Sequence, residues 1–520
     1  MKRLSVFILV IVFSGSSLYA QEISPNGYYI DALRFSQTNS GGSARISALG
    51  GSSIALGGDI TAASSNPAGL GLYNRSEFSI TLGATYMNNN TRFNGNKAYS
   101  QDIFAGLQNL GFVINNTEKE TKGWLGGSFG FSVNKINDFN NEFRYWGTNN
   151  QNSIVDYFIE SADGQPASYF PADYLATDLT TLAYYTYLVG PWNVMDETYP
   201  DDEYFSDVTT FVRPNLKQHE VVKTFGDQFQ WSFSYGSNFS DFLYVGFGIG
   251  IVSLDYNAVK YYTESEFEYN SDDPYYANYD PISQINVTED LNIRGTGFNS
   301  TFGFIFRPVG FFRVGGSITT PTIYQINDRY NADLEADWND FFYGDLISGD
   351  TVLNHVSAYT ADVASRYGLN TPLKASVGAA FFLGKLGFFT ADIEYLNYGK
   401  VYLRGSEFSM DSDNTYMKDN FSESLNLKVG AELRFGAMRA RAGYALSQVP
   451  LTAGPDYISP NQRFSAGFGV HHRNFFADFA LINNHVTTSY SPYMLGNNSQ
   501  PEIELKVNNF TALGSIGVKF

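Results

Sequence analysis

The sequence contains no cysteine and only five histidines among its 520 residues. The missing thiol excludes disulfides, thiolate metal sites and cysteine nucleophiles. Positive charge is also scarce, since 33 Lys and Arg stand against 52 Asp and Glu, which gives a formal net charge of −19. This balance removes the general electrostatic attraction on which nucleic-acid binding depends. We therefore predict no nucleic-acid partner.

Long apolar runs are absent after residue 20, where no segment approaches the roughly 18 apolar residues expected of a membrane-spanning helix. Aromatic residues nevertheless make up 17% of the chain, while its mean hydropathy is only −0.21. Alternation of apolar and polar residues along strands accounts for both values. A soluble protein of this length would instead need about three domains.

The first 20 residues have the layout of a secretory signal peptide. Two basic residues follow Met1, the segment from Leu4 to Phe13 is apolar except for Ser5, and small residues lead to Ala20. We predict cleavage after Ala20 and export of residues 21–520.

Several segments alternate strictly between apolar and polar residues. From Leu425 to Phe435 every second residue is apolar, and the residues between them include Lys428, Glu432 and Arg434. Because successive strand side chains point to opposite faces, each such segment has one apolar face. A soluble β-sandwich would show the same alternation, so the alternation alone does not identify the fold.

The number of strands and the lengths of their connections favour a membrane barrel. We predict fourteen antiparallel strands, at residues 77–87, 110–116, 123–147, 228–237, 242–268, 285–306, 311–336, 371–384, 386–404, 424–436, 438–448, 462–473, 475–490 and 506–520. After the first few strands, tight turns alternate with long connections, the longest at about 149–227. Short periplasmic turns and long outer loops are typical of outer-membrane barrels of Gram-negative bacteria.

The N-terminal segment 21–76 lacks this alternation. Its small residues and the pair Asn66-Pro67, a good helix start, predict short helices. A lumen of fourteen strands is too wide for barrel side chains to fill, so we predict that this segment is a hatch inside residues 77–520. A disordered periplasmic arm is the alternative.

The sequence around Asn66-Pro67 and two segments near the C-terminus resemble the FadL/TodX outer-membrane transport family. Asn66, Pro67 and Ala68 match its hatch motif, and the segments from Arg441 to Tyr444 and from Ser459 to Gly467 are similar to its penultimate strands. The resemblance implies a fourteen-stranded barrel with a hatch that carries long-chain fatty acids or aromatic hydrocarbons, with release sideways into the bilayer. It also implies that Phe520 addresses the chain to the barrel-insertion machinery.

In these terms, one or two inward cations would hold a fatty-acid carboxylate. Arg463 is the first candidate, followed by Arg441 and Lys428, because guanidinium groups pair with carboxylates in a bidentate manner. The alternative is that these cations neutralise Glu432, Glu394 and Asp392 within the wall. We expect no catalytic residues, metal or cofactor, and no enzyme activity.

The sequence is consistent with two functions. The first is a monomeric channel embedded in outer-membrane lipid, which captures hydrophobic small molecules at its outer loops. In the long loop, Phe170, Leu179 and Leu182 could form an apolar landing surface or could pack within the loop. The second function is a barrel without transport activity that docks a protein secretion or surface complex.

Overall fold

The computed structural model describes residues 27–37, 41–117, 122–170, 176–192, 200, 202–213, 215–269, 281–345, 349–405, 408–452, 455 and 457–520. The predicted signal peptide and its cleavage after Ala20 lie outside the described residues. Within the described ranges, no helix is both long and apolar enough to cross a membrane.

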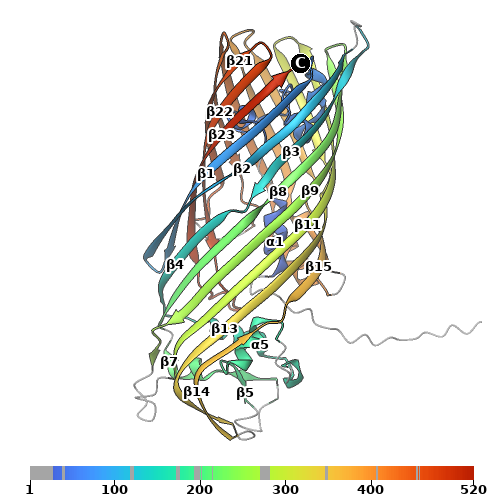
Figure 1. Ribbon diagram of the computed structural model, residues 1–520. Coiled ribbons are helices and arrows are strands. Elements are labelled where there is room, and N and C mark those ends of the chain that lie inside the picture. Colours follow the sequence, from blue (N-terminus) through green and yellow to red (C-terminus); the bar gives the residue numbers. More distant parts are fainter. Residues whose placement is uncertain are drawn as a thin grey trace, which may run out of the picture.

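The chain forms a closed antiparallel barrel of fourteen strands, which confirms the predicted fold class (Figure 1). Pairing of the first strand with the last, from Glu77 opposite Lys519 to Arg92 opposite Glu504, closes the cylinder. Ten barrel strands are continuous: β1 (Glu77–Phe93), β2 (Asn96–Thr117), β8 (Leu216–Phe239), β9 (Leu243–Ser265), β11 (Ile282–Val309), β19 (Glu423–Phe435), β20 (Met438–Ser447), β21 (Asn461–His472), β22 (Phe475–Tyr490) and β23 (Ile503–Lys519).

The other four barrel strands are interrupted. They consist of β3 (Trp124–Asp138) with β4 (Asn141–Asn149), β12 (Phe312–Thr319) with β13 (Ile323–Asp345), β14 (Gly349–Tyr359) with β15 (Val363–Asn370) and β16 (Lys374–Phe382), and β17 (Gly387–Asn397) with β18 (Tyr402–Gly405). The short helix η3 (Tyr398–Lys400) separates the last two segments.

Several predicted boundaries were wrong. Residues 88–93, 96–109, 337–345, 349–359 and 363–370, predicted as connections, belong to strands instead. The turn Asn94-Gly95, with φ of 44° and 87°, joins β1 directly to β2, and an Asn-Gly pair is a strong hairpin signal that the prediction missed. The long loop is shorter than predicted, because β8 begins at Leu216 rather than at residue 228.

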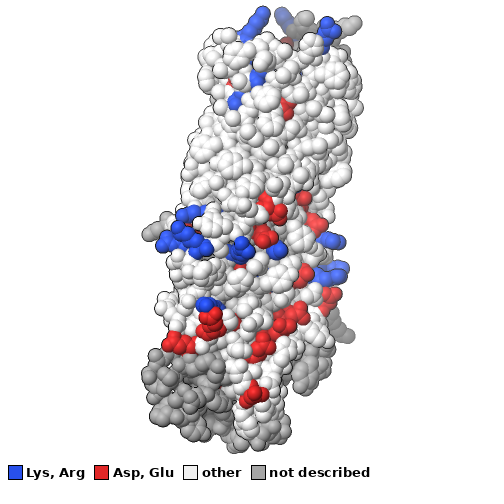
Figure 2. Space-filling model, turned by 60° about the vertical axis from the view of Figure 1, so that its left-hand side comes forward, with Lys and Arg blue, Asp and Glu red and all other residues white. Residues whose placement is uncertain are grey.

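The outer face of the barrel is apolar, as the alternation predicted. Phe468, Ile516 and Val377 are each more than 60% exposed on strands whose neighbouring residues point inward. On the face shown in Figure 2, charged side chains are sparse on the half of the barrel nearer the C-terminus and gather on the other half. An apolar belt flanked by charge is the surface that a lipid bilayer requires.

A lobe of loops and small helices covers the barrel end opposite the C-terminus (Figure 1). It contains α4 (Ile154–Ala162), η2 (Ala167–Tyr169), α5 (Leu179–Tyr185), β5 (Gly190–Pro191), β6 (Tyr204–Phe205), α7 (Asp207–Phe211), β7 (Val212–Arg213) and β10 (Glu268–Tyr269). Phe170, Leu179 and Leu182 are buried in its core. These three residues therefore pack within the lobe and do not form the exposed landing surface.

Residues 27–37 and 41–76 of the N-terminal segment lie inside the barrel (Figure 1). They contain α1 (Tyr28–Ser36), α2 (Ala44–Ser47), α3 (Ala62–Ser65) and η1 (Pro67–Leu72). The backbone N–H of Tyr29 donates to Asp413 of α8 (Asp411–Asn420) over 3.0 Å, which attaches α1 to the loop after β18. Burial raises the pKa of Asp31 on α1, while its ion-pair partner Arg34 acts in the opposite direction.

Candidate functional site

Residues 41–76, which we call the inner segment, contact strands on several sides of the barrel. Asn66 is 1% exposed, and its side chain caps η1 by accepting from the Ala68 N–H over 3.2 Å. Its Nδ2 donates to the carbonyl of Ile54 over 2.7 Å and to that of Phe304 on β11 over 3.1 Å. The predicted helix start is confirmed, and the same Asn also joins the inner segment to the wall.

Strand glycines permit this close approach. A Cβ at Gly303 would lie 1.9 Å from Asn66 Oδ1, and one at Gly443 would lie 2.1 Å from the backbone nitrogen of Gly50. Since real Cβ atoms do not tolerate such distances, a larger residue at either position would displace the inner segment. The abundance of glycine in these strands therefore has a packing reason.

Asp392 on β17 provides a second attachment. Its Oδ2 accepts from the backbone N–H groups of Ser53 and Ile54 over 2.6 and 3.0 Å. The neighbouring Thr390 and Ser52 hydroxyls lie 2.9 Å apart. Asp392 is thus used to hold the inner segment rather than to neutralise a predicted ligand-binding cation.

The structure places the three predicted ligand-binding cations in three environments. Arg441 is 4% exposed and lies within the wall, where its Nε donates to Glu432 over 2.7 Å and its Nη1 to Asp478 over 2.6 Å. Both carboxylates are themselves buried. Arg441 is therefore already paired on two sides.

Lys428 lines an inner cavity of about 100 Å³ between the inner segment and the wall. Its Nζ donates to Glu394 over 3.1 Å. Lys428 is therefore neutralised within the wall, as the alternative prediction stated. Lys374, which sequence reasoning did not single out as a ligand-binding residue, lines the same cavity. Much of the remaining lining is Ser and Thr, so the cavity suits a polar group rather than the apolar tail of a ligand.

Arg463 lines a different cavity, of about 240 Å³, together with Thr85, Gln108 and Lys135. We call it the seam cavity because it adjoins an interruption in the wall between β2 and β4, which we call the seam. Strand β2 pairs with β3 only from Asn109 to Thr117, whereas β4 forms its ladder with β8. In the described chain, residues 96–108 of β2 consequently have no ladder partner on the side of β4.

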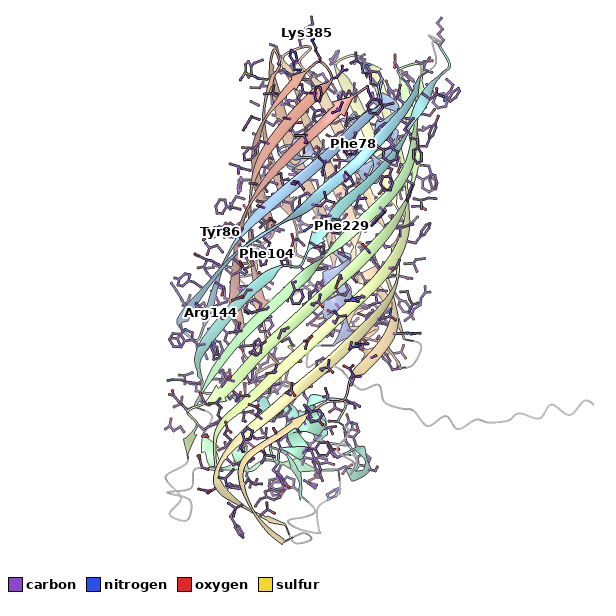
Figure 3. The ribbon with its side chains drawn as sticks, viewed as in Figure 1. Phe78, Tyr86, Phe104, Arg144, Phe229 and Lys385 are labelled. Atoms are coloured by element: carbon purple, nitrogen blue, oxygen red, sulfur yellow. The ribbon has the colours of Figure 1, made fainter. Side chains whose placement is uncertain are left out.

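Side chains bridge part of this seam. The Thr91 hydroxyl donates to the carbonyl of Arg144 over 2.6 Å, and Arg144 Nε donates to the carbonyl of Tyr99 over 3.2 Å. In Figure 3, Tyr86 and Phe104 lie on one side of the divergence of β2 from β4, and Phe229 and Arg144 lie on the other. Gln108 is the bulged residue of β2, since Asn109 pairs with Thr81 and Leu107 with Leu82.

We predicted residues 123–147 as one continuous strand, so the seam was not anticipated. The break between β3 and β4 falls at Phe139-Asn140, within a run of Asn and Asp residues that weakens strand propensity. This run was the signal from which the break in the strand could have been predicted.

In the described part of the chain, no three His, Asp or Glu side chains converge to hold a metal ion.

No protein-family model matches the chain, and no match was found among curated proteins. Solved structures of similar fold include two transport proteins. A Pseudomonas aeruginosa FadL homologue aligns over 93% of this chain and 99% of its own, with a TM-score of 0.54 and 11% identity. The Pseudomonas putida toluene transporter TodX aligns over 92% and 99%, with a TM-score of 0.50 and 13% identity. The chain therefore has the fold of FadL- and TodX-type transport proteins, as its hatch-like motif suggested.

Proposed function

We propose that this protein is an outer-membrane channel for hydrophobic small molecules. The observation that carries the proposal is the seam cavity, which lies inside the barrel wall where β2 leaves β3 and β4. Outward-facing Ile103 and Leu82 on β2 and β1 are 67% and 58% exposed, so an apolar surface continues directly from the seam. A molecule that leaves the lumen here would enter the hydrocarbon layer without crossing water.

In this proposal a ligand enters from the lobe end, meets the inner segment and leaves through the seam. The inner segment acts as the hatch, because it occupies the lumen on the direct path to the other end. Long-chain fatty acids and aromatic hydrocarbons are the ligand classes proposed, by analogy with the transporters of the same fold. The protein acts as a monomer in outer-membrane lipid, after insertion guided by Phe520.

Two cations are assigned to ligand binding. Arg463 lines the seam cavity and faces the carboxylate of an acidic ligand there, whereas Lys428 lines the inner cavity and meets the carboxylate while it keeps its ion pair with Glu394. Arg441 is instead assigned to the wall, because its two buried carboxylate partners would be left unpaired if it turned towards a ligand.

Uptake of a labelled fatty acid and of labelled toluene by cells with and without the protein tests this function. Gln108→Trp fills the seam cavity and should reduce uptake of a transported compound at least about fivefold, since one bulky ring blocks a passage of this size. Ile103→Trp is the matched control, because that side chain points outward from the same strand and should leave uptake unchanged.

Equal uptake with and without the protein would contradict the proposal. Equal uptake by the Gln108→Trp variant and the parent protein would contradict the sideways route alone. Recovery of a stoichiometric protein partner in affinity purification, combined with absent uptake, would favour the docking barrel.

A further inference from the structure

A third cavity, of about 490 Å³, lies at the end of the barrel that carries the short turns. Four arginines line it: Arg45 from the inner segment, Arg307 and Arg313 beside the turn between β11 and β12, and Arg434 from β19. Among the described residues, no Asp or Glu lines this cavity. We call it the arginine cavity.

This concentration of charge is unusual for a chain with 33 basic and 52 acidic residues. Four guanidinium groups around one space repel one another, and the repulsion grows when water is partly excluded. Such an arrangement destabilises the folded chain unless an anion enters the space. The nearest carboxylates are those of Glu432 and Asp59.

Those carboxylates are already shared. Glu432 accepts from Arg441 over 2.7 Å and from Arg434 over 2.8 Å, and it lies 3.8 Å from Arg45. Asp59, 3.7 Å from Arg45, also accepts the Ser43 hydroxyl. Within the described residues, neither Arg307 nor Arg313 forms an ion pair with a carboxylate.

Within the described residues, Arg313 uses only part of its hydrogen-bond donors. Its Nη1 donates to the Leu56 carbonyl over 2.7 Å, and its guanidinium carbon lies 4.5 Å from the centre of the Phe382 ring. Its Nε is buried and has no acceptor. Buried donors are nearly always satisfied, and a small shift of the Arg313 side chain would let an anion in the cavity accept from this one.

We propose that the arginine cavity binds an organic oxyanion, a carboxylate or phosphate carried on a small apolar body, which enters from the periplasm. Guanidinium groups match both oxyanions with paired N–H donors. Leu56, Leu72 and Phe382 supply apolar surface beside them. The volume also falls in the range of about 300 to 1,000 Å³ found for small-molecule sites. This site does not depend on the transport function, because it lies on the far side of the inner segment from the lobe.

Isothermal titration of the full chain in neutral detergent tests the proposal with four probes: octanoate, octyl phosphate, octanol and inorganic phosphate. The two amphipathic anions should bind and compete with each other, and their relative affinities distinguish carboxylate from phosphate. Arg313→Gln and Arg307→Gln should each weaken anion binding about tenfold or more, since each removes a charge-assisted contact.

Lys385→Gln is the matched control, because Lys385 is an exposed cation in the adjacent turn between β16 and β17 and does not line the cavity (Figure 3). It should bind both anions as the parent does. Heat-modified gel mobility verifies that each variant folds, and two separate Arg variants guard against the misfolding of one.

Absence of binding by both amphipathic anions would overturn the proposal, as would unchanged affinity in both Arg variants. Binding of inorganic phosphate alone would overturn the apolar part of the assignment. Octanol binding as tight as that of octanoate, and unchanged in both Arg variants, would also overturn the proposal, because the anionic group would then contribute nothing.

Discussion

Arg441 illustrates how a residue's partners decide its role. The alternation of side chains along β20 correctly predicted that Arg441 points inward. The same alternation could not show that Glu432 on the neighbouring β19 and Asp478 on β22 both lie within hydrogen-bonding distance of Arg441. Cross-strand neighbours depend on register, which the alternation of a single strand does not contain.

Replacing Arg441 by Gln should destabilise the barrel by about 3 to 5 kcal/mol, because two buried carboxylates lose their shared partner. Urea unfolding in lipid vesicles measures the effect. Arg439→Gln is the control, since Arg439 donates to the carbonyls of Gly436 and Met438 in its own turn. Equal destabilisation by both substitutions would argue against the buried network.

At the level of the strand, the lipid-facing pattern is the most predictable feature. Leu427 on β19 is 38% exposed and points outward, as predicted from the segment 425–435. Leu427→Arg should cost about 2 to 4 kcal/mol if its position is near the middle of the bilayer, because a guanidinium loses its water there. Leu427→Phe keeps the surface apolar and should have little effect, and both are compared by urea unfolding in vesicles.

The seam makes a second prediction about strands. In the described chain, residues 96–107 of β2 are paired with β1 but have no ladder partner on the side of β4, whereas β9 is paired with β8 and β11 along nearly its whole length. Amides of β2 that face the seam should exchange with solvent deuterium on the order of tenfold faster than those of β9. Peptide-resolved exchange in lipid nanodiscs provides the measurement. Equal protection of the two strands would show that the seam is closed.

At the level of the whole molecule, the barrel and the inner segment are separable in principle. Closure depends on pairing of β1 with β23, and Ser76 and Phe520 exchange backbone hydrogen bonds of 3.1 and 3.0 Å where the chain ends meet. None of these contacts involves residues 41–70.

Deletion of residues 41–70 should therefore leave a barrel that folds, as judged by heat-modified mobility, but that lets small solutes pass. Swelling of liposomes that contain the variant measures this permeability, with the full chain as the reference. An impermeable variant that has folded would contradict the role of the inner segment as a hatch.

The sequence by itself determined the barrel, the strand faces, the positions of the late turns and the capped start of η1 at Asn66. These features depend on alternation and on local chemistry, which neighbouring residues along the chain are sufficient to encode.

Tertiary structure alone decided the pairing of Arg441, the seam between β2 and β4 and the assembly of the arginine cavity from Arg45, Arg307, Arg313 and Arg434. The reason is that each depends on groups that are far apart in sequence and are brought together by register and barrel closure. A regular alternating pattern specifies the face on which a side chain lies, but it does not specify the neighbour that the side chain meets there.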